Sequence, residues 1–122
     1  GQAQEGIEWI RRAMRLNPID PNTGAARTGI ADLMHLRGDY EAAIQMLERA
    51  KAEQPGFFST LLGLVVTCWK AGRIADARRH AEVLRAAVPD LTVSGYMQDR
   101  PDTTAVWHQD IKDALLGVGF PE

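Results

Sequence analysis

An internal repeat of 34 residues constrains the fold of this chain more than any other feature of its sequence. When the 122-residue sequence is shifted by 34 positions, small, apolar and helix-ending residues superimpose. A fixed period of this length indicates consecutive copies of one supersecondary unit. The identical pairs are Gly38/Gly72, Ala43/Ala77, Ala52/Ala86 and Pro55/Pro89, and the apolar pairs are Ile30/Leu64, Ala31/Val65, Met34/Cys68 and Tyr40/Ile74.

A partial third copy precedes the first complete one, at an offset of 37 residues. The three extra residues fit an insertion at positions 19–21. Gly1 occupies the place of the turn glycine, so we expect the array to start in mid-repeat, without the first helix of that copy. The matching upstream residues are Gly1, Gly6, Ile7, Ile10, Arg12, Ala13 and Pro18.

Each complete copy predicts two antiparallel helices joined by a tight turn. Within residues 24–57 the apolar residues recur at spacings of three and four, which is the period of a helix that buries one face. Gly38 separates two such stretches and can adopt the left-handed conformation that ends a helix, and Asp39 follows it as an expected N-cap. Pro55 ends the second helix. By the same reasoning the second copy has helices at about 58–71 and 74–87, a turn at Gly72 and a stop at Pro89.

Small residues mark the places where neighbouring helices are expected to approach closely. These are Ala43, Ala50 and Ala77. A larger side chain there would overpack the contact at a cost of about 1–3 kcal/mol.

The last thirty residues break the period and predict a cap. Residues 91–98 suit a short helix, and apolar residues from Trp107 to Val118 mark an amphipathic helix that ends near Gly117 and Gly119. Repeat arrays need such an atypical final element, with an apolar inner face and a polar outer face. We therefore predict an all-α array of five to six antiparallel helices. Its parts are the second helix of a truncated repeat (1–18), two complete repeats (24–57 and 58–91) and C-terminal capping helices (92–122).

This pattern resembles the tetratricopeptide repeat, whose 34 residues run tryptophan-x2-leucine-glycine-x2-tyrosine, then alanine-x3-phenylalanine, then proline. The resemblance covers residues 1–89. Arg27 replaces the tryptophan of the first complete repeat, and Val65 replaces the small residue of the second. In the second repeat Leu61 holds the tryptophan position. The later positions are held by Ile30, Ala31, Met34, Ala43, Leu47, Ala50 and Pro55 in the first repeat and by Leu64, Val65, Cys68, Ala77, Ala81, Leu84 and Pro89 in the second.

Three further segments are similar to the C-terminal repeat region of multidomain bacterial signalling proteins, especially class III adenylate or guanylate cyclases. They are RAMRLNPIDP, AVPDLTVSGYMQDRP and GVGFPE. In those proteins the catalytic domain lies upstream, and none of its metal-binding aspartates or nucleotide-binding motifs can be placed in this chain.

Charge and motif content argue against several classes of function. A net charge of −2 gives no general attraction to nucleic acid or to an anionic membrane. The apolar stretch 61–69 is far shorter than the roughly 20 residues that span a bilayer, and no secretory leader precedes it, so we expect a cytoplasmic protein. The sequence contains no phosphate loop, zinc-protease motif or nucleophile elbow, and a single cysteine cannot build a zinc site. We therefore expect no catalytic residue, no metal and no cofactor.

The histidines and the cysteine favour structural roles. We expect His35 and His80 on solvated helix faces. His108 and Asp110, two residues apart, would point in different directions from a helix and are interpreted as surface residues. Cys68 falls on a buried stripe and is expected in the core.

The remaining candidate site is a peptide-binding groove. By resemblance to the family, the first helix of each repeat lines the concave surface. Chaperone-binding members carry lysine and asparagine at positions held here by Thr28 and Asp32, then Leu62 and Val66, so that partner is not expected. An apolar strip that ends at Trp69 suits an apolar helix or extended segment, unless the short helix with Tyr96 and Met97 covers it. The groove candidates are Thr28, Asp32, His35, Leu36, Leu62, Val66, Trp69 and Lys70, with Ala25 and Ser59 at its start.

Three classes of function stay open at this point. The first is a protein-interaction or regulatory module that binds a protein or peptide segment. The second is a self-association unit, because the helix at about 3–16 lacks its upstream partner and exposes an apolar face; a homodimer would cover it. The third, an enzyme, rests only on a cyclase domain outside the chain. The self-association candidates are Ile7, Trp9, Ile10 and Met14.

Overall fold

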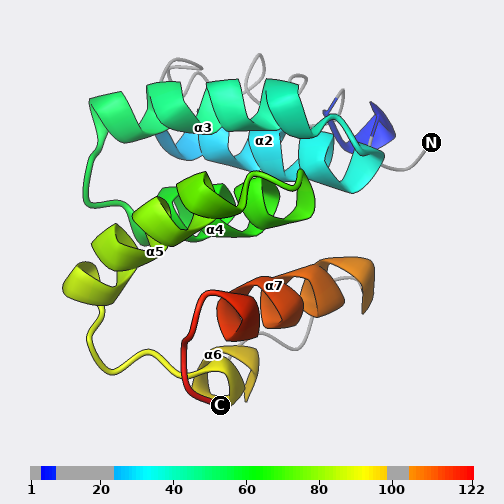
Figure 1. Cartoon of the computed structure of the whole chain (residues 1–122). Helices are drawn as coiled ribbons and strands as arrows, with labels where there is room; N and C mark the ends of the chain where they lie inside the picture. Colours follow the sequence, from blue (N-terminus) through cyan, green and yellow to red (C-terminus); the bar gives the residue numbers. More distant parts are fainter. Residues whose placement is uncertain (1–3, 8–23, 99–104) are drawn as a thin grey trace.

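A computed structural model describes residues 4–7, 24–98 and 105–122, and every regular element within those ranges is a helix (Figure 1). This confirms the predicted all-α array of helix hairpins. Residues 4–7 are helical as well. The helices that follow are α2 (Gly24–Arg37), α3 (Tyr40–Glu53), α4 (Phe58–Lys70), α5 (Ile74–Ala87), α6 (Val93–Gln98) and α7 (Ala105–Gly117).

Two hairpins, α2–α3 and α4–α5, form where the repeat was found. Their turn glycines have left-handed backbones, with φ of 90° at Gly38 and 82° at Gly72, as predicted. The following amide closes each turn: the Asp39 N–H donates to the Met34 carbonyl and the Arg73 N–H to the Cys68 carbonyl, both at 2.9 Å. This is the glycine-dependent helix ending that satisfies otherwise unpaired carbonyls.

Asp39 is the N-cap residue of α3, as predicted, but its side chain makes no capping hydrogen bond. Its backbone (φ −85°, ψ 64°) lies outside the extended conformation that an N-cap usually adopts. Its carboxylate instead accepts a 2.7 Å hydrogen bond from the Arg37 guanidinium across the turn.

The two hairpins pack through small and aliphatic residues. Ala43 and Ala77 are fully buried, in agreement with their predicted role at close helix contacts. At Gly63 a Cβ atom would lie 3.1 Å from the Leu47 side chain, so the absence of a side chain there lets the hairpins approach. The cluster that joins the hairpins, called here the inter-hairpin cluster, is Ala31, Ala43, Ile44, Leu47, Leu64, Cys68 and Ala77.

The helix α7 covers the side of α4 that faces away from the first hairpin (Figure 1). Because α4 packs against α7 as well as against both hairpins' other helices, every one of its residues from Thr60 to Cys68 is buried. The tail after α7 turns at Gly119 (φ 100°) and buries Phe120, whose ring lies 4.7 Å from the Arg85 guanidinium carbon. The tail also meets α6, since the Val93 amide donates to the Pro121 carbonyl at 2.9 Å. Among the described residues, no helix has the length and apolar character needed to cross a bilayer.

Candidate functional site

The first helices of the two hairpins, α2 and α4, share one surface, called here the inner face. It carries the eight groove residues that the sequence singles out. Thr28, His35, Leu62 and Val66 are buried, whereas Lys70 is exposed. Asp32, Leu36 and Trp69 are partly exposed. The inner face is therefore covered over most of its length and open at the end that carries Lys70.

The cover is mainly α7. Ile111, Ala114 and Leu115 are fully buried and belong to the same apolar cluster as Leu62 and Val66. The short helix α6 contributes at the other end, where the Tyr96 ring lies 6.0 Å from the Phe58 ring. The sequence left open whether the segment with Tyr96 and Met97 covers the apolar strip; that segment contributes, but the larger part of the cover is α7.

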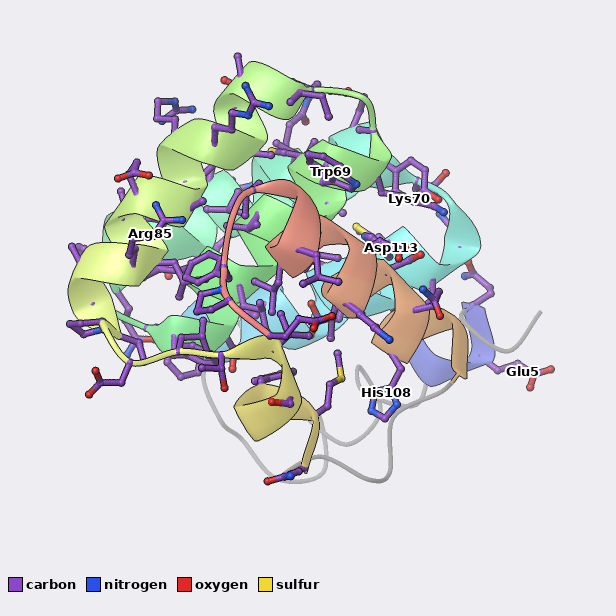
Figure 2. All side chains as sticks on the ribbon, turned by 60° about the horizontal axis from the view of Figure 1, so that its bottom comes forward. Glu5, Trp69, Lys70, Arg85, His108 and Asp113 are labelled. Atoms are coloured by element: carbon purple, nitrogen blue, oxygen red, sulfur yellow. The ribbon has the colours of Figure 1, made fainter. Side chains whose placement is uncertain are left out.

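Gly117 lets the end of α7 lie against the Trp69 ring. A Cβ atom at Gly117 would sit 2.3 Å from Trp69 Cη2 and Cζ2, a distance that no real contact allows. Figure 2 shows Trp69 beside the C-terminal end of α7, with Lys70 near the same helix. Only a residue without a side chain fits this place.

Beside the apolar contact lies a buried polar network around His35. Its Nε2 atom is 2.8 Å from Asp110 Oδ2 on α7, and its Nδ1 atom is 2.9 Å from Thr67 Oγ1 on α4. The second carboxylate oxygen of Asp110 lies 3.4 Å from Lys70 Nζ. The network thus joins α2, α4 and α7.

The protonation of His35 follows from this environment. Burial lowers its pKa, although the hydrogen bond and charge of Asp110 oppose that shift. A neutral imidazole fits both contacts: Nε2–H donates to Asp110, and the Thr67 hydroxyl donates to Nδ1. His35 and Asp110 were both expected on the surface, and that expectation was wrong because α7 folds back with Asp110 against His35.

The order hydroxyl, imidazole, carboxylate is also that of a nucleophilic triad. Thr67, however, is only 1% exposed, and its hydroxyl is held between packed helices. A substrate has no path to it, so the network is suited to holding helices together and not to catalysis.

Four polar pairs connect the hairpins at a constant offset of 32 residues. On the first helices these are Thr28–Thr60 (2.7 Å) and His35–Thr67 (2.9 Å). On the second helices they are Glu41–Arg73 (3.2 Å) and Glu48–His80 (3.0 Å). In each case the two pairs lie seven residues, or two helical turns, apart. A residue of one repeat therefore meets the residue two positions before its equivalent in the next.

Burial also shifts the pKa of three further side chains: Asp32, His80 and Cys68. Burial raises the pKa of Asp32, whose carboxylate points toward Gly63, to about 7. His80 is fully buried, not solvated as expected, and burial lowers its pKa against the opposing charge of Glu48. Its Nδ1 has no hydrogen-bond partner among the described residues. The rise in the pKa of the buried Cys68 thiol to about 11 agrees with its predicted place in the core.

The geometry and the repeat pattern lead to a family. A family model for the tetratricopeptide repeat matches residues 34–94, which is half of the chain. The chain belongs to the tetratricopeptide repeat family. The match runs from the end of α2 through α5 and into α6. No curated protein matches the chain.

Tetratricopeptide repeats generally mediate protein–protein contacts and are typically non-catalytic. Of the eight groove residues, Leu62 and Val66 share an apolar cluster with α7, and His35 bonds to Asp110 of α7. Within the described ranges, no cluster of three or more His, Cys, Asp or Glu residues is placed to hold a metal ion.

The self-association residues fall partly outside the described ranges, which do not include Trp9, Ile10 and Met14. Ile7 is described and buried, and a Cβ at its neighbour Gly6 would lie 3.2 Å from the Leu33 side chain. The short helical segment at 4–7 therefore packs on α2, as expected for one side of its apolar stripe.

Sequence reasoning missed Asp110 and Thr67. A signal for Asp110 was available, because positions 110, 111, 114, 115 and 118 share one face of a helix, and a carboxylate on an apolar face requires a partner. For Thr67 the signal is the offset of 32, at which a hydroxyl or charge in one tetratricopeptide repeat meets a complementary group in the next.

Proposed function

We propose that the chain is a non-catalytic protein-interaction module that takes a helical protein segment on its inner face. The observation that carries this proposal is the seating of α7, an amphipathic helix held on the inner face by apolar contacts and by one paired carboxylate. A surface that accepts one such helix has the shape and polarity to accept another. The contact residues in this proposal are Thr28, Asp32, His35, Leu36, Leu62, Val66, Trp69 and Lys70.

We assign the two repeats of the module to residues 24–57 and 58–91, with capping helices at 92–122 and the remainder of an earlier repeat at 1–18. The module belongs, in this proposal, to the C-terminal part of a larger cytoplasmic bacterial signalling protein such as a class III adenylate or guanylate cyclase. The similarity of three sequence segments to that region supports this context.

Site-specific photocrosslinking in the full chain tests the interaction module. A benzophenone amino acid at Leu36, at the partly open edge of the inner face, should capture a partner segment in cells. The same group at Arg78, exposed on α5, is the matched control. A crosslinked protein found at Leu36 and absent at Arg78 supports the proposal; equal capture at both positions, or none at Leu36, contradicts it.

The signalling context has a separate test. The purified chain, incubated with ATP or GTP and Mg²⁺ or Mn²⁺, should form no cyclic nucleotide, because no phosphate loop or metal-binding carboxylate motif is present in its sequence. Turnover by the isolated chain would refute the assignment of chemistry to an upstream domain. The sequence encoded upstream of Gly1 would show directly whether a cyclase domain is there.

Self-association is the second candidate, and the apolar stripe of Ile7, Ile10 and Met14 favours it. Because Ile7 is covered within its own chain, the contact with a second copy would rest on the other side of the stripe and on Trp9. Light scattering on the wild type and on an Ile7→Glu, Trp9→Glu double variant tests this. A monomeric wild type at tens of micromolar, or a dimer that both changes leave intact, would exclude it.

A further inference from the structure

Asp110 is an unexpected residue for a helix whose only task is to cover a core. It is 7% exposed, and its two oxygens are used by different helices, one by His35 of α2 and the other by Lys70 of α4. Buried ion pairs are weak contributors to stability, and apolar residues of similar volume often replace them without loss. The carboxylate does discriminate among ligands, because a helix without it would lose the hydrogen bond with His35 and the charge contact with Lys70.

The opposite end of α7 discriminates by size. Gly117 lies against Trp69 at a place where any side chain would collide, and Ala114 is fully buried one turn earlier. Between these small residues and Asp110, the apolar side chains of Ile111 and Leu115 fill the inner face. The face of α7 therefore has the features of a recognition motif, with an acidic residue, bulky apolar residues and small residues at fixed positions.

We propose that α7 occupies the inner face as an intramolecular ligand. The partner that binds this face in place of α7 is an amphipathic helix of another protein, with the same residue pattern as α7. That helix carries Asp or Glu at its first contact position and a bulky apolar residue next to it. A small residue follows four positions after the acid, a bulky apolar residue five after and glycine seven after. The inference rests on the proposed function, since it names the partner of the same face.

The groups around Lys70 give the partner an entry point. The Lys70 side chain is 47% exposed, so an incoming carboxylate can pair with it before Asp110 has left. The tail beyond α7 is held by Phe120 against Arg85 and by the bonds from α6 to its last carbonyls. Displaced α7 therefore stays near the inner face and competes at high effective concentration, which lowers the apparent affinity for the partner.

A peptide with the sequence of residues 105–122, fluorescently labelled, serves as the probe. It should bind the full chain carrying Gly117→Leu at least about tenfold more tightly than the wild type, because the new side chain collides with Trp69 and loosens the chain's own α7. Equal affinity for both chains, or no binding to either, would overturn the proposal.

A charge exchange tests the recognition by Asp110. Asp110→Lys in the peptide should weaken binding about tenfold or more, and Lys70→Glu in the Gly117→Leu chain should restore it. The control peptide carries Asp113→Lys, which reverses an exposed carboxylate on the same helix and should bind like the parent. If both altered peptides bind equally well, the carboxylate has no role in recognition and the proposal fails.

If Gly117→Leu fails to fold, hydrogen exchange of the wild-type chain still tests whether α7 can leave the inner face. Amides of α7 should exchange through local opening, faster than those of α4, and excess peptide should speed their exchange further. If α7 exchanges only with global unfolding and the peptide has no effect, α7 is a permanent part of the core. That result with continued crosslinking at Leu36 would overturn this inference alone, whereas peptide binding without any crosslinked partner would overturn the proposed function.

Discussion

The contact between the two hairpins and the contact beneath α7 both place polar groups beside an apolar centre, but only the first repeats its polar pairs along the chain. The inter-hairpin cluster is built from alanines, aliphatic residues and a neutral thiol. The contact beneath α7 has an apolar centre with Asp110, His35 and Lys70 beside it. The first contact is one that any two repeats make, and the second selects the helix that fills it.

The two contacts also differ in how they relate to the 34-residue period. Ala43 and Ala77 are equivalent positions of the two repeats, and both lie in the inter-hairpin cluster. The residues of α7 have no equivalents in the repeats, and its contact is made once. A contact that recurs in each repeat can be recognised from the period of the sequence. A contact that is made once can be recognised only from the pattern of apolar residues on one helix.

The largest expected effect on stability comes from truncating a buried leucine, and one leucine from each contact allows a comparison. Leu64 of the inter-hairpin cluster and Leu115 of α7 are both 0% exposed. Leu64→Ala should lower the free energy of unfolding by about 2–5 kcal/mol and weaken all the helices together, because it leaves a cavity between the hairpins.

Leu115→Ala removes the same atoms from the contact beneath α7. If that contact is separable, amides of α7 should lose protection in hydrogen exchange while those of α3 and α4 keep theirs. Urea unfolding followed by circular dichroism measures the global change. If Leu64→Ala and Leu115→Ala lose the same free energy of unfolding and show the same pattern of amide exchange, the two contacts do not differ in the way described.

The hairpins were predictable because their determinants are local and occur twice. Gly38 and Gly72 mark turns whose positive φ favours glycine, and Pro55 and Pro89 each follow the helix end by two residues. In the second repeat these signals predicted helices at about 58–71 and 74–87, and the observed α4 and α5 agree with those bounds within a residue.

The site was predictable only in part. The eight groove residues were chosen by resemblance, and the sequence left open whether another element covers them. His35 was assigned to solvent because a histidine on a helix face does not reveal that Asp110, 75 residues later, lies against it. Long-range pairing of single polar residues depends on how α7 folds back, which no local pattern encodes.

The next largest effect on stability is expected from a substitution in the polar part of the contact beneath α7. Asp110→Ala should cost about 1.5–3 kcal/mol, because His35 and Lys70 lose a charged hydrogen-bond partner in a buried place. Asp113→Ala, on the exposed side of the same helix, should cost no more than about 0.5 kcal/mol. Thermal unfolding of both variants makes the comparison, and equal losses would show that the network contributes nothing beyond a surface pair.

A smaller effect is expected at the repeat turn. Gly72→Val should cost about 1–2 kcal/mol, because a β-branched residue resists the left-handed backbone at φ 82°. Gly56→Val is the matched control, since Gly56 also has open space around its Cβ position but does not have a positive φ. An unchanged melting temperature for Gly72→Val would mean that the turn does not constrain the hairpin.

The smallest effect concerns Asp32, the carboxylate of α2 that lies between the two contacts. Burial raises its pKa from 3.8 to about 7, so between these values the folded protein binds a proton that the unfolded chain releases. Its contribution to stability is therefore full below about pH 4 and is lost as the pH rises through 7. Because Asp32 is partly exposed, water reduces the penalty, and we expect Asp32→Asn to stabilise the chain by on the order of 1 kcal/mol at pH 8.

The same substitution should change stability much less near pH 4, where the aspartic acid is neutral in the folded chain and only about half ionised in the unfolded chain. The difference between wild type and Asp32→Asn isolates this group, because the opposite effect of His35, whose pKa burial lowers, is present in both chains. Urea unfolding at pH 4, 6 and 8 should give a difference that grows with pH. A difference that stays constant, or shrinks as the pH rises, would mean that the charged Asp32 carboxylate is solvated in the folded protein and that burial does not raise its pKa.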